Sequence, residues 1–381
     1  MPSAKVHPSV HCYNTAIWAC GAAGKWERAV ALLREMPLGG NSLSPDEITY
    51  NSAIWACGKR GKWEEALKLL TEMQEVGLRP GLTSFNSVIT AFGNGQQWQN
   101  AVRLLRDMEK LGVKPDAISY NAAIVACRDS NQWGQALELL NEMPKVGIAP
   151  DLASYSSAIR ACGKGRQWQK AVSVLREMGN LGVKPTLASY NAAITACRDS
   201  DQWEQALDLL NEMHLVGISP DLFSYSSTIY ACSQGRHSAI SACRKHGHWE
   251  RATALLREMP SVGITPNVVS YTAAISTCTH KWERALALLR EMPKKGIAPN
   301  YHSYKAAIEA CGRGRQWAQA VALLREMPGV GVLPNSATYA TAIEACGYSG
   351  RGDEALALFR EMPRTGIAPN AVTYNAVITA C

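Results

Sequence analysis

Residues 187–221 read LASYNAAITACRDSDQWEQALDLLNEMHLVGISPD, and this stretch decides the fold because variants of it recur along nearly the whole chain. Its first part places Tyr190, Ile194 and Cys197 at the spacing i, i+4 and i+7, which lines one face of a helix. From Trp203 onward, Leu and Met residues follow the helical period and predict the apolar face of a second helix. One unit is therefore a pair of helices joined by a short polar turn.

Three residues mark the ends of the helices in this unit. Gly217 follows the second helix, where a left-handed cap favours glycine, and Pro220 prevents the helix from continuing. Asp221 directly precedes the next first helix and can cap its N-terminus. Neither helix buries its apolar face alone, so successive pairs are expected to stack into a one-dimensional array.

The repeat has a period close to 35 residues. Each unit is numbered so that its Tyr or Phe is position 4. Most intervals between units are then 35 residues, with single intervals of 37, 46 and 33. The predicted organisation is an N-terminal stub 1–9, repeats 10–46, 47–81, 82–116, 117–151, 152–186 and 187–221, an irregular unit 222–267, repeats 268–300, 301–335 and 336–370, and a partial repeat 371–381.

The composition agrees with a folded helical array and excludes several classes of protein. Of the 381 residues, 47% are hydrophobic, which excludes a disordered chain, and 19% are charged. The chain has no run of about 18 apolar residues, so we expect no membrane-spanning helix and no membrane partner. The net charge of +7 permits a polyanionic partner without requiring one.

Cysteine and tryptophan also follow the repeat. Eleven of the twelve Cys residues fall at position 11, where Phe92 stands in the third repeat, so we interpret them as reduced core thiols. Nine of the eleven Trp residues, from Trp26 to Trp317, fall at position 17, where the second helix begins, and we interpret them as core residues. The other two, Trp18 and Trp55, fall at position 9.

The unit resembles the pentatricopeptide repeat in its Tyr-Asn start, its LLxEM segment and its Gly-x-x-Pro-Asp end, and the resemblance covers residues 10–381. It implies an all-α protein, a right-handed α-solenoid (superhelix) of about ten helix-turn-helix repeats. It further implies binding of single-stranded RNA at one base per repeat. We expect no cofactor, no metal and no enzymatic activity of the chain itself.

In this family, residues 5 and 35 of the same repeat read the base. Position 5 follows the core Tyr and is expected to point away from the core, where an Asn amide can donate to and accept from a base edge. The pairs that the resemblance assigns to base reading are Asn14 and Asp46, Asn51 and Gly81, Asn86 and Asp116, Asn121 and Asp151, Ser156 and Thr186, Asn191 and Asp221, Ser226 and Asn267, Thr272 and Asn300, and Lys305 and Asn335.

Both positions also have an explanation that needs no RNA. Asn and Ser are tolerated in the first turn of a helix, which could account for position 5. Every residue at position 35 is an acceptable N-cap, so capping explains the set of residue types found there. Only the choice between Asp and Asn is then left for recognition to explain.

The family's pairing rules imply a target. Asn with Asp resembles a uracil reader in repeats 1, 3, 4 and 6, whereas Thr or Ser with Asn resembles an adenine reader. With the N-terminal repeat at the 5′ end of the RNA, the implied target resembles U-Y-U-U-R-U-(A)-A-N-N. The family clamps each base with residue 2, and three Ala at this position predict little stacking (Ala153, Ala188 and Ala337).

Position 13 carries the expected phosphate contacts, because the family often has a Lys there that faces the RNA backbone. The matching residues are Lys59, Lys164, Lys245 and Arg313. Asp129 and Asp199 occupy the same position in two other repeats and would oppose an anion. With four phosphate contacts to a single strand, a plot of the logarithm of the binding constant against the logarithm of the salt concentration would have a slope of about −3.

The unit 222–267 departs from the period by 11 residues. Residues 222–236 resemble a first helix and turn without a second helix, and the pattern resumes from His237. We interpret this as two units joined with a deletion between them, and an insertion into one unit is the alternative. Either way, we expect the apolar face of 222–236 to lack its partner, which predicts a kink or a local mismatch.

Two short motifs resemble zinc-binding sequences. Residues 248–250 match the H-x-E of zinc deaminases, but the accompanying P-C-x-x-C is absent. Cys243, His246 and His248 could suggest a zinc site, but they fall on repeat and turn positions, so we expect none. The alternative function is a protein–protein interaction scaffold of the tetratricopeptide type, whose period is 34 residues.

The resemblance also suggests a cellular setting. The family works mostly in mitochondria or plastids, on RNA processing, stability, editing or translation, often with catalytic RNA-processing partners that act in trans. No transit peptide is visible in MPSAKVHPSV, the first residues of the sequence. The organellar setting is therefore implied by kinship alone.

Overall fold

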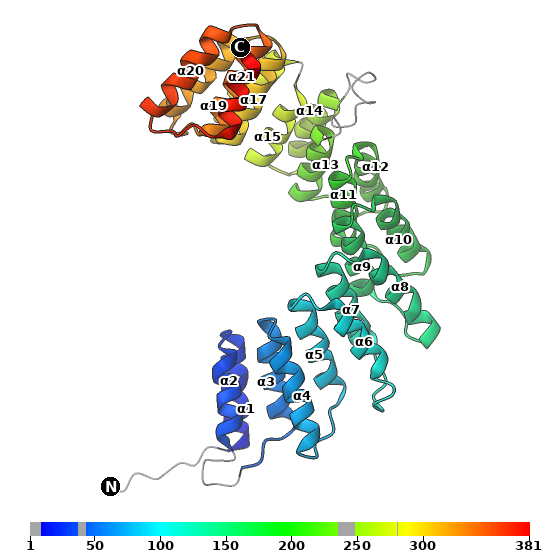
Figure 1. Cartoon of the computed structure of the whole chain (residues 1–381). Coiled ribbons are helices and arrows are strands. Elements are labelled where there is room, and N and C mark those ends of the chain that lie inside the picture. The colour runs from blue at the N-terminus through cyan, green and yellow to red at the C-terminus, as the bar shows by residue number, and fades with distance from the viewer. Residues whose placement is uncertain (1–8, 37–42, 235–247, 280) are drawn as a thin grey trace, which may run out of the picture. The chain divides into compact units, whose positions relative to one another are not determined.

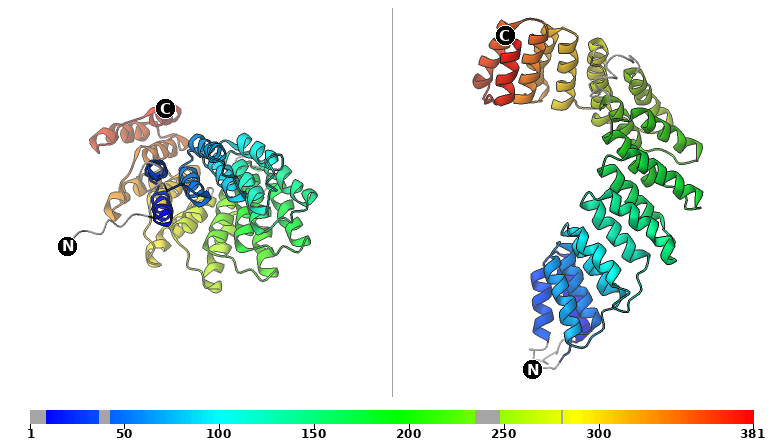
Figure 2. Two further views of the ribbon diagram at one scale, coloured as in Figure 1. Left: turned by 90° about the horizontal axis from the view of Figure 1, so that it is seen from below. Right: turned by 45° about the vertical axis from the view of Figure 1, so that its right-hand side comes forward.

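The computed structural model describes residues 9–36, 43–234, 248–279 and 281–381, and these residues form α-helices, short 3₁₀ turns and loops, with no strand among them (Figure 1). The all-α prediction is confirmed. The chain divides into two compact units, residues 1–196 and 197–381. Within each unit, helices pair into antiparallel hairpins that stack side by side (Figure 2). No described helix combines the length and apolar character that crossing a bilayer requires.

The helices alternate between first and second members of a hairpin. The first helices are α1 (Val10–Ala22), α3 (Glu47–Lys59), α5 (Leu82–Asn94), α7 (Ala117–Asp129), α9 (Leu152–Lys164), α11 (Leu187–Asp199), α13 (Leu222–Gln234), α15 (Val268–Thr277), α17 (Tyr301–Arg313), α19 (Ser336–Tyr348) and α21 (Ala371–Ala380). The second helices are α2 (Trp26–Glu35), α4 (Trp63–Glu75), α6 (Trp98–Asp107), α8 (Trp133–Glu142), α10 (Trp168–Asn180), α12 (Trp203–Leu215), α14 (His248–Glu258), α16 (Trp282–Lys294), α18 (Trp317–Glu326) and α20 (Gly352–Arg364). Three second helices continue into 3₁₀ turns at Met143–Val146, Met259–Val262 and Met327–Val330.

The helix ends follow the predicted caps. Gly217 has a φ of 75°, the left-handed conformation that glycine adopts without steric cost, and the Ile218 N–H then bonds the carbonyl of Met213 at 2.9 Å. Asp221 caps α13, because its Oδ1 accepts the backbone N–H of Ser224 at 2.8 Å. These local bonds fix the angle between the end of one hairpin and the start of the next.

The core of each hairpin lies between its two helices and the neighbouring first helix. In repeat 5, Tyr155, Ile159 and Cys162 of α9 face Leu175 and Met178 of α10, and each is at most 2% exposed. Truncating such an Ile to Ala typically costs about 2–5 kcal/mol. Burial raises the pKa of the Cys162 thiol to about 12, which keeps it protonated and inert at neutral pH.

The Trp residues at position 17 are only half-buried, so their interpretation as core residues is wrong. They lie at the start of the second helix and reach to the turn of the following repeat. A Cβ on Gly314 would lie 2.6 Å from Cδ1 of Trp282, and a Cβ on Gly95 would lie 2.5 Å from Cδ1 of Trp63. The indole therefore packs at the junction between repeats, where the turn has glycine to make room for it.

The irregular unit 222–267 has a complete hairpin, so the expectation that the apolar face of 222–236 lacks a partner is wrong. Helix α14 packs against α13. The Tyr225 hydroxyl donates to Glu258 Oε1 at 2.9 Å, as the Tyr271 hydroxyl donates to Glu291 Oε1 at 2.9 Å in the next hairpin. Helices α13 and α14 thus pack as the two helices of one hairpin, whereas residues 235–247, on which the choice between a deletion and an insertion depends, lie outside the described residues.

Candidate functional site

Residues 5 and 35 of a repeat lie next to one another. The side-chain amide of Asn at position 5 donates to the Asp carboxylate at position 35, because the first helix of one repeat packs beside the N-terminus of the next first helix. The Nδ2–Oδ1 distances are 3.3 Å for Asn14 and Asp46, 3.4 Å for Asn86 and Asp116, and 3.1 Å for Asn121 and Asp151. The structure thus brings together the two positions that the sequence paired.

The residue at position 35 is also the N-cap of the following first helix. Asp46 Oδ1 accepts the backbone N–H of Thr49 at 2.8 Å and the Thr49 hydroxyl at 2.7 Å. Burial raises the pKa of the Asp46 carboxyl, but the hydrogen bonds from Thr49 and Asn14 outweigh burial, so the net pKa lies below its ordinary value. Asp46 is therefore ionised at neutral pH and holds two helices in register.

Several polar atoms at position 5 have no hydrogen-bond partner among the described residues. Asn14 Oδ1, Asn86 Oδ1, Ser226 Oγ and Thr272 Oγ1 are buried and lack a hydrogen bond within the described part of the chain. A buried polar atom without a partner costs about 1–3 kcal/mol. Four repeats carry this cost at the same position, so position 5 is the recurrent polar feature of the first helices that the protein leaves unsatisfied among its described residues.

Other predicted pairs are arranged differently. Asn51 is half-buried, and its partner Gly81 has no side chain to contact it. Ser156 Oγ and Thr186 Oγ1 do not meet directly but each lies near Ser189 Oγ, at 3.3 and 3.2 Å. Asn191 belongs to the first unit and is half-buried, and Asp221 belongs to the second unit and caps α13.

The remaining pairs lie in the second unit. Ser226 is buried at 9% exposure, whereas position 5 was expected to point away from the core. Thr272 and Lys305 are half-buried. The residues at position 35 cap helices through their side-chain oxygens, which accept the N–H of the third helical residue (Asn267 from Ser270 at 3.0 Å, Asn300 from Ser303 at 3.0 Å and Asn335 from Thr338 at 3.0 Å).

Apolar side chains at position 2 are exposed beside this row. Ile48, Ile118 and Val269 are more than half exposed on the first helices of their repeats. Exposed β-branched side chains at regular intervals leave apolar area open to a flat ring. Some repeats of each unit therefore combine a polar side chain at position 5 with exposed apolar area at position 2.

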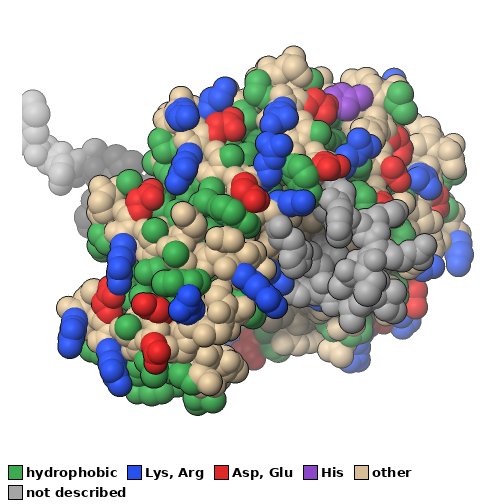
Figure 3. All heavy atoms as spheres, turned by 90° about the horizontal axis from the view of Figure 1, so that it is seen from above, with side chains coloured by type: hydrophobic (Ala, Val, Ile, Leu, Met, Phe, Trp, Pro, Cys, Tyr) green, Lys and Arg blue, Asp and Glu red, His purple; other side chains and the backbone are tan. Residues whose placement is uncertain are grey.

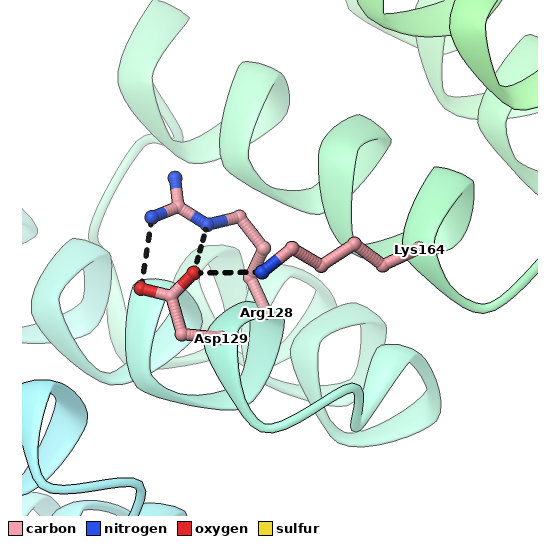
Figure 4. A network of polar contacts seen from close by, with 3 residues as sticks. All are labelled: Arg128, Asp129 and Lys164. Atoms are coloured by element: carbon pink, nitrogen blue, oxygen red, sulfur yellow. Dashed lines mark hydrogen bonds and ion pairs between the residues drawn. The ribbon is translucent and has the colours of Figure 1, made fainter. Parts of the chain in front are cut away.

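The described cations at position 13 are engaged within the protein. The Lys59 ammonium donates to the carbonyl of Ala22 at 2.8 Å, and Arg313 pairs with Glu309 at 3.0 Å. Lys164 Nζ lies 3.1 Å from Asp129 Oδ1, and Arg128 binds the same carboxylate (Figure 4). Lys245 lies outside the described residues.

Charges of both signs are interspersed on the face seen in Figure 3. A face of mixed charge gives weaker long-range attraction for a polyanion than a single-sign patch. Among the described residues, no cluster of three or more His, Cys, Asp or Glu is arranged to hold a metal ion.

The sequence analysis missed position 3. Thr49, Ser84 and Ser119 at this position are fully buried and bond the residues at position 35, and Ser84 also bonds position 5. The signal that could have found them is the recurrence of Ser or Thr two residues before Asn or Ser at position 5. Their direct contact with predicted base-reading residues makes them part of the candidate site.

Comparison with known proteins identifies the family. The PPR repeat family matches residues 45–94, 185–234 and 340–381. The pentatricopeptide repeat domain matches 103–165, 238–281 and 254–314, and the PPR repeat matches 11–40, 83–113, 153–183 and 302–332. These segments together cover most of the sequence, so the chain belongs to the pentatricopeptide repeat family. No curated protein matches the chain.

Solved structures of similar fold are distant in sequence. PPR10 in complex with an 18-nucleotide psaJ RNA element is 22% identical, with a TM-score of 0.47, and the match covers 98% of this chain and 56% of that chain. PPR10 from maize is 22% identical at a TM-score of 0.40, covering 98% and 66%. Yeast Rmd9p in complex with a 16-nucleotide target RNA is 10% identical at a TM-score of 0.43, covering 97% and 84%. This chain thus spans 56% of the length of the first of these proteins.

Proposed function

We propose that this chain binds single-stranded RNA, with one base at each repeat and with no catalytic activity of its own. The observation that carries the proposal is the row of polar atoms at position 5 that lack a hydrogen bond among the described residues, which include Asn14 Oδ1 and Asn86 Oδ1. The edge of a nucleobase carries donors and acceptors that can pair with the amide and hydroxyl groups at position 5. Membership of the family makes RNA the first candidate ligand.

The proposed recognition joins two kinds of contact. The Asn–Asp pairs present carboxylate and amide oxygens, which accept the imino N–H of uracil, whereas cytosine has a lone pair at that atom. Exposed apolar side chains at position 2, such as Ile48 and Ile118, cover the faces of the bases. The proposed target is U-Y-U-U-R-U-(A)-A-N-N, read from the N-terminal repeat at its 5′ end.

We place the protein in mitochondria or plastids, where the family mostly acts, with processing enzymes recruited in trans. Fluorescence anisotropy tests the binding itself. The RNA UUUUAUAAUU should bind more tightly than CUCCACAAUU, by roughly tenfold or more. Asn86→Ala should reduce this difference, whereas Asn141→Ala, on the exposed face of α8, should leave it unchanged.

Equal binding of the two RNAs would remove the one-base-per-repeat reading. Absence of binding to either RNA would remove RNA as the ligand and would favour the protein-interaction scaffold. Binding that Asn86→Ala and Asn141→Ala weaken equally would show that the polar row has no special role.

A further inference from the structure

A buried hydroxyl stands at position 3 of each first helix from α3 to α21, from Thr49 to Thr373, and its residue is 0% exposed in every case. Each hydroxyl oxygen accepts the backbone N–H of the preceding residue 35, for example from Gly81 at 3.2 Å and from Asn300 at 2.9 Å. The hydroxyl has one proton of its own to donate. The acceptor that receives this proton differs from repeat to repeat.

The residue at position 35 determines the acceptor. Where it is Asp, the hydroxyl donates to the carboxylate, as Ser119 does to Asp116 Oδ1 at 2.9 Å. Where it is Asn, the hydroxyl donates to the cap's backbone carbonyl, as Ser303 does to Asn300 at 2.8 Å. One carboxylate oxygen of Asp accepts both the helix N–H and the hydroxyl, as Asp116 Oδ1 does from Ser119. The amide oxygen of Asn accepts the helix N–H but carries no full negative charge, so the hydroxyl donates to the backbone carbonyl instead.

Gly81 creates a third case. It has no side chain, and the Ser84 hydroxyl instead donates to Asn51 Oδ1, at position 5 of the preceding repeat, at 2.6 Å. Ser154 is intermediate, since its hydroxyl lies 2.6 Å from Asn121 Oδ1 and 2.9 Å from Asp151 Oδ1. The hydroxyl therefore reaches the base-reading amide in some repeats and not in others.

This choice and residue 35 together decide which end of the position-5 amide is left unpaired among the described residues, since in repeat 4 Ser154 binds Asn121 Oδ1 while Asp151 accepts the Asn121 amide N–H. In repeat 3, the Asn86 amide donates to Asp116 at 3.4 Å, and its Oδ1 has no partner within the described residues. In repeat 2, the Ser84 hydroxyl occupies Asn51 Oδ1, so the amide N–H groups are the part of Asn51 left for a ligand. The first arrangement leaves an acceptor for a base once the half-buried side chain turns outward, and the second leaves a donor.

We propose that the position-3 hydroxyl of the following repeat is a positioning residue that sets which end of the position-5 amide faces the RNA base. This inference rests on the proposed RNA binding and extends it to a third residue per repeat. It assigns to Ser84 the pyrimidine preference of repeat 2, because a fixed amide donor selects a base with an acceptor at the same place. Without the hydroxyl, the Asn51 amide rotates freely and offers either end.

The test is Ser84→Ala, with Ser303→Ala as the matched control. Both variants remove a hydroxyl that accepts an N-cap N–H, so both lose a similar capping bond. Only Ser84 also bonds a position-5 side chain. Affinities are measured for decamers that carry each of the four bases at the second or the eighth nucleotide.

We expect Ser84→Ala to reduce the preference at the second base by roughly threefold to tenfold, the range of one hydrogen bond, and to leave the other bases unchanged. Ser303→Ala should lower the melting temperature similarly but leave the preference at the eighth base intact. Ser84→Thr should restore the wild-type profile, since Thr49 and Thr338 show that Thr fits this position.

A second measurement does not depend on RNA. The side-chain amide resonances of ¹⁵N-labelled Asn51 should shift in Ser84→Ala and return in Ser84→Thr. An unmoved resonance, or an unchanged second-base preference in Ser84→Ala, would overturn the inference while leaving RNA binding in place. A wild-type chain that binds all decamers equally would overturn both proposals.

Discussion

The ammonium of Lys164 lies 3.1 Å from the carboxylate of Asp129, which stands at the same position one repeat earlier. Arg128 binds this carboxylate as well, at 3.0 Å, so one anion is shared by two cations (Figure 4). The hydrogen bonds from Arg128 and Lys164 outweigh the effect of burial and lower the pKa of Asp129. A cation expected to meet phosphate is thus held by the protein itself.

Asp129→Asn should release Lys164 toward the RNA backbone. We expect tighter binding at low salt and a log–log salt slope steeper by about 0.7, the value for one additional phosphate contact. Asp107→Asn removes the same charge from α6, where Asp107 pairs with Lys110 at 2.7 Å, and serves as the control. Equal effects of the two substitutions would show that only net charge matters.

Asp151→Asn should change the preference of repeat 4 from uracil toward cytosine. The Asn121 amide donates to both carboxylate oxygens, at 3.1 and 3.3 Å, and an Asn in place of Asp151 would exchange one acceptor for a donor. The helix cap should survive, because Asn300 caps α17 in the same way. Competition between RNAs with U or C as the fourth base measures the change, and an unchanged preference would contradict the pairing.

Asn335→Asp is the control for this exchange. It makes the reverse change at a cap whose partner, Lys305, matches no readable pair. Thermal melting should show changes of less than about 0.5 kcal/mol for both variants, because Asp and Asn cap helices almost equally well. A shift of base preference in Asn335→Asp would show that position 35 acts without position 5.

The sequence predicts the features that depend on a few neighbouring residues and misses those that depend on contacts between repeats. Helix periods, the glycine after each second helix and the N-caps are encoded within a few residues, so the hairpins and the all-α array follow from them. The neighbourhood of Asn14 and Asp46 follows from the repeat register and family resemblance, whereas their role in reading bases remains a prediction. The acceptor of the Ser84 hydroxyl proton could not be predicted from the sequence, because it depends on distances between adjacent repeats.

The pairing of α13 with α14 was missed for a related reason. The repeat pattern is interrupted after residue 236, and no second helix follows 222–236 at the usual spacing. The sequence therefore predicted that this first helix has no partner. Packing needs only that a suitable second helix reaches the first, and the spacing along the chain does not show whether one does. The half-buried Trp residues at position 17 were misassigned for the same reason, because the pattern within one repeat does not show their contacts with the next repeat.

Glu344→Gln should stabilise the second unit at neutral pH. Burial, followed by repulsion from Glu309, raises the pKa of the Glu344 carboxyl. A raised folded-state pKa means that this carboxyl contributes stability below its unfolded pKa and loses that contribution as pH rises through the folded pKa. We expect a gain of roughly 0.5 kcal/mol at pH 7, after allowance for solvent screening, which disappears in acid.

Urea denaturation between pH 4 and pH 7 measures this difference. Glu354→Gln removes an exposed carboxylate near the start of α20 and serves as the control. A stabilisation by Glu344→Gln that persists unchanged at pH 4 would show that the gain comes from packing and not from charge.

Tyr225→Phe and Glu258→Gln should be coupled in a double-mutant cycle, because the Tyr225 hydroxyl donates to Glu258 Oε1 at 2.9 Å and joins the two helices of the irregular unit. A hydrogen bond to a charged group contributes about 1.5–3 kcal/mol, and part of this should remain because the same hydroxyl also contacts His214 Nε2 at 3.3 Å. We therefore expect a coupling free energy of about 1 kcal/mol in the free energy of unfolding.

The pair Tyr271 and Glu291 provides the reference, since the same atoms meet at 2.9 Å in a hairpin of ordinary length. Similar coupling free energies in the two cycles would establish that α14 packs against α13 as α16 packs against α15. If only the Tyr271 cycle shows coupling, the Tyr225 hydroxyl does not meet Glu258 in solution, and α13 must find another partner for its apolar face. Denaturation followed by far-UV circular dichroism gives both cycles under the same conditions.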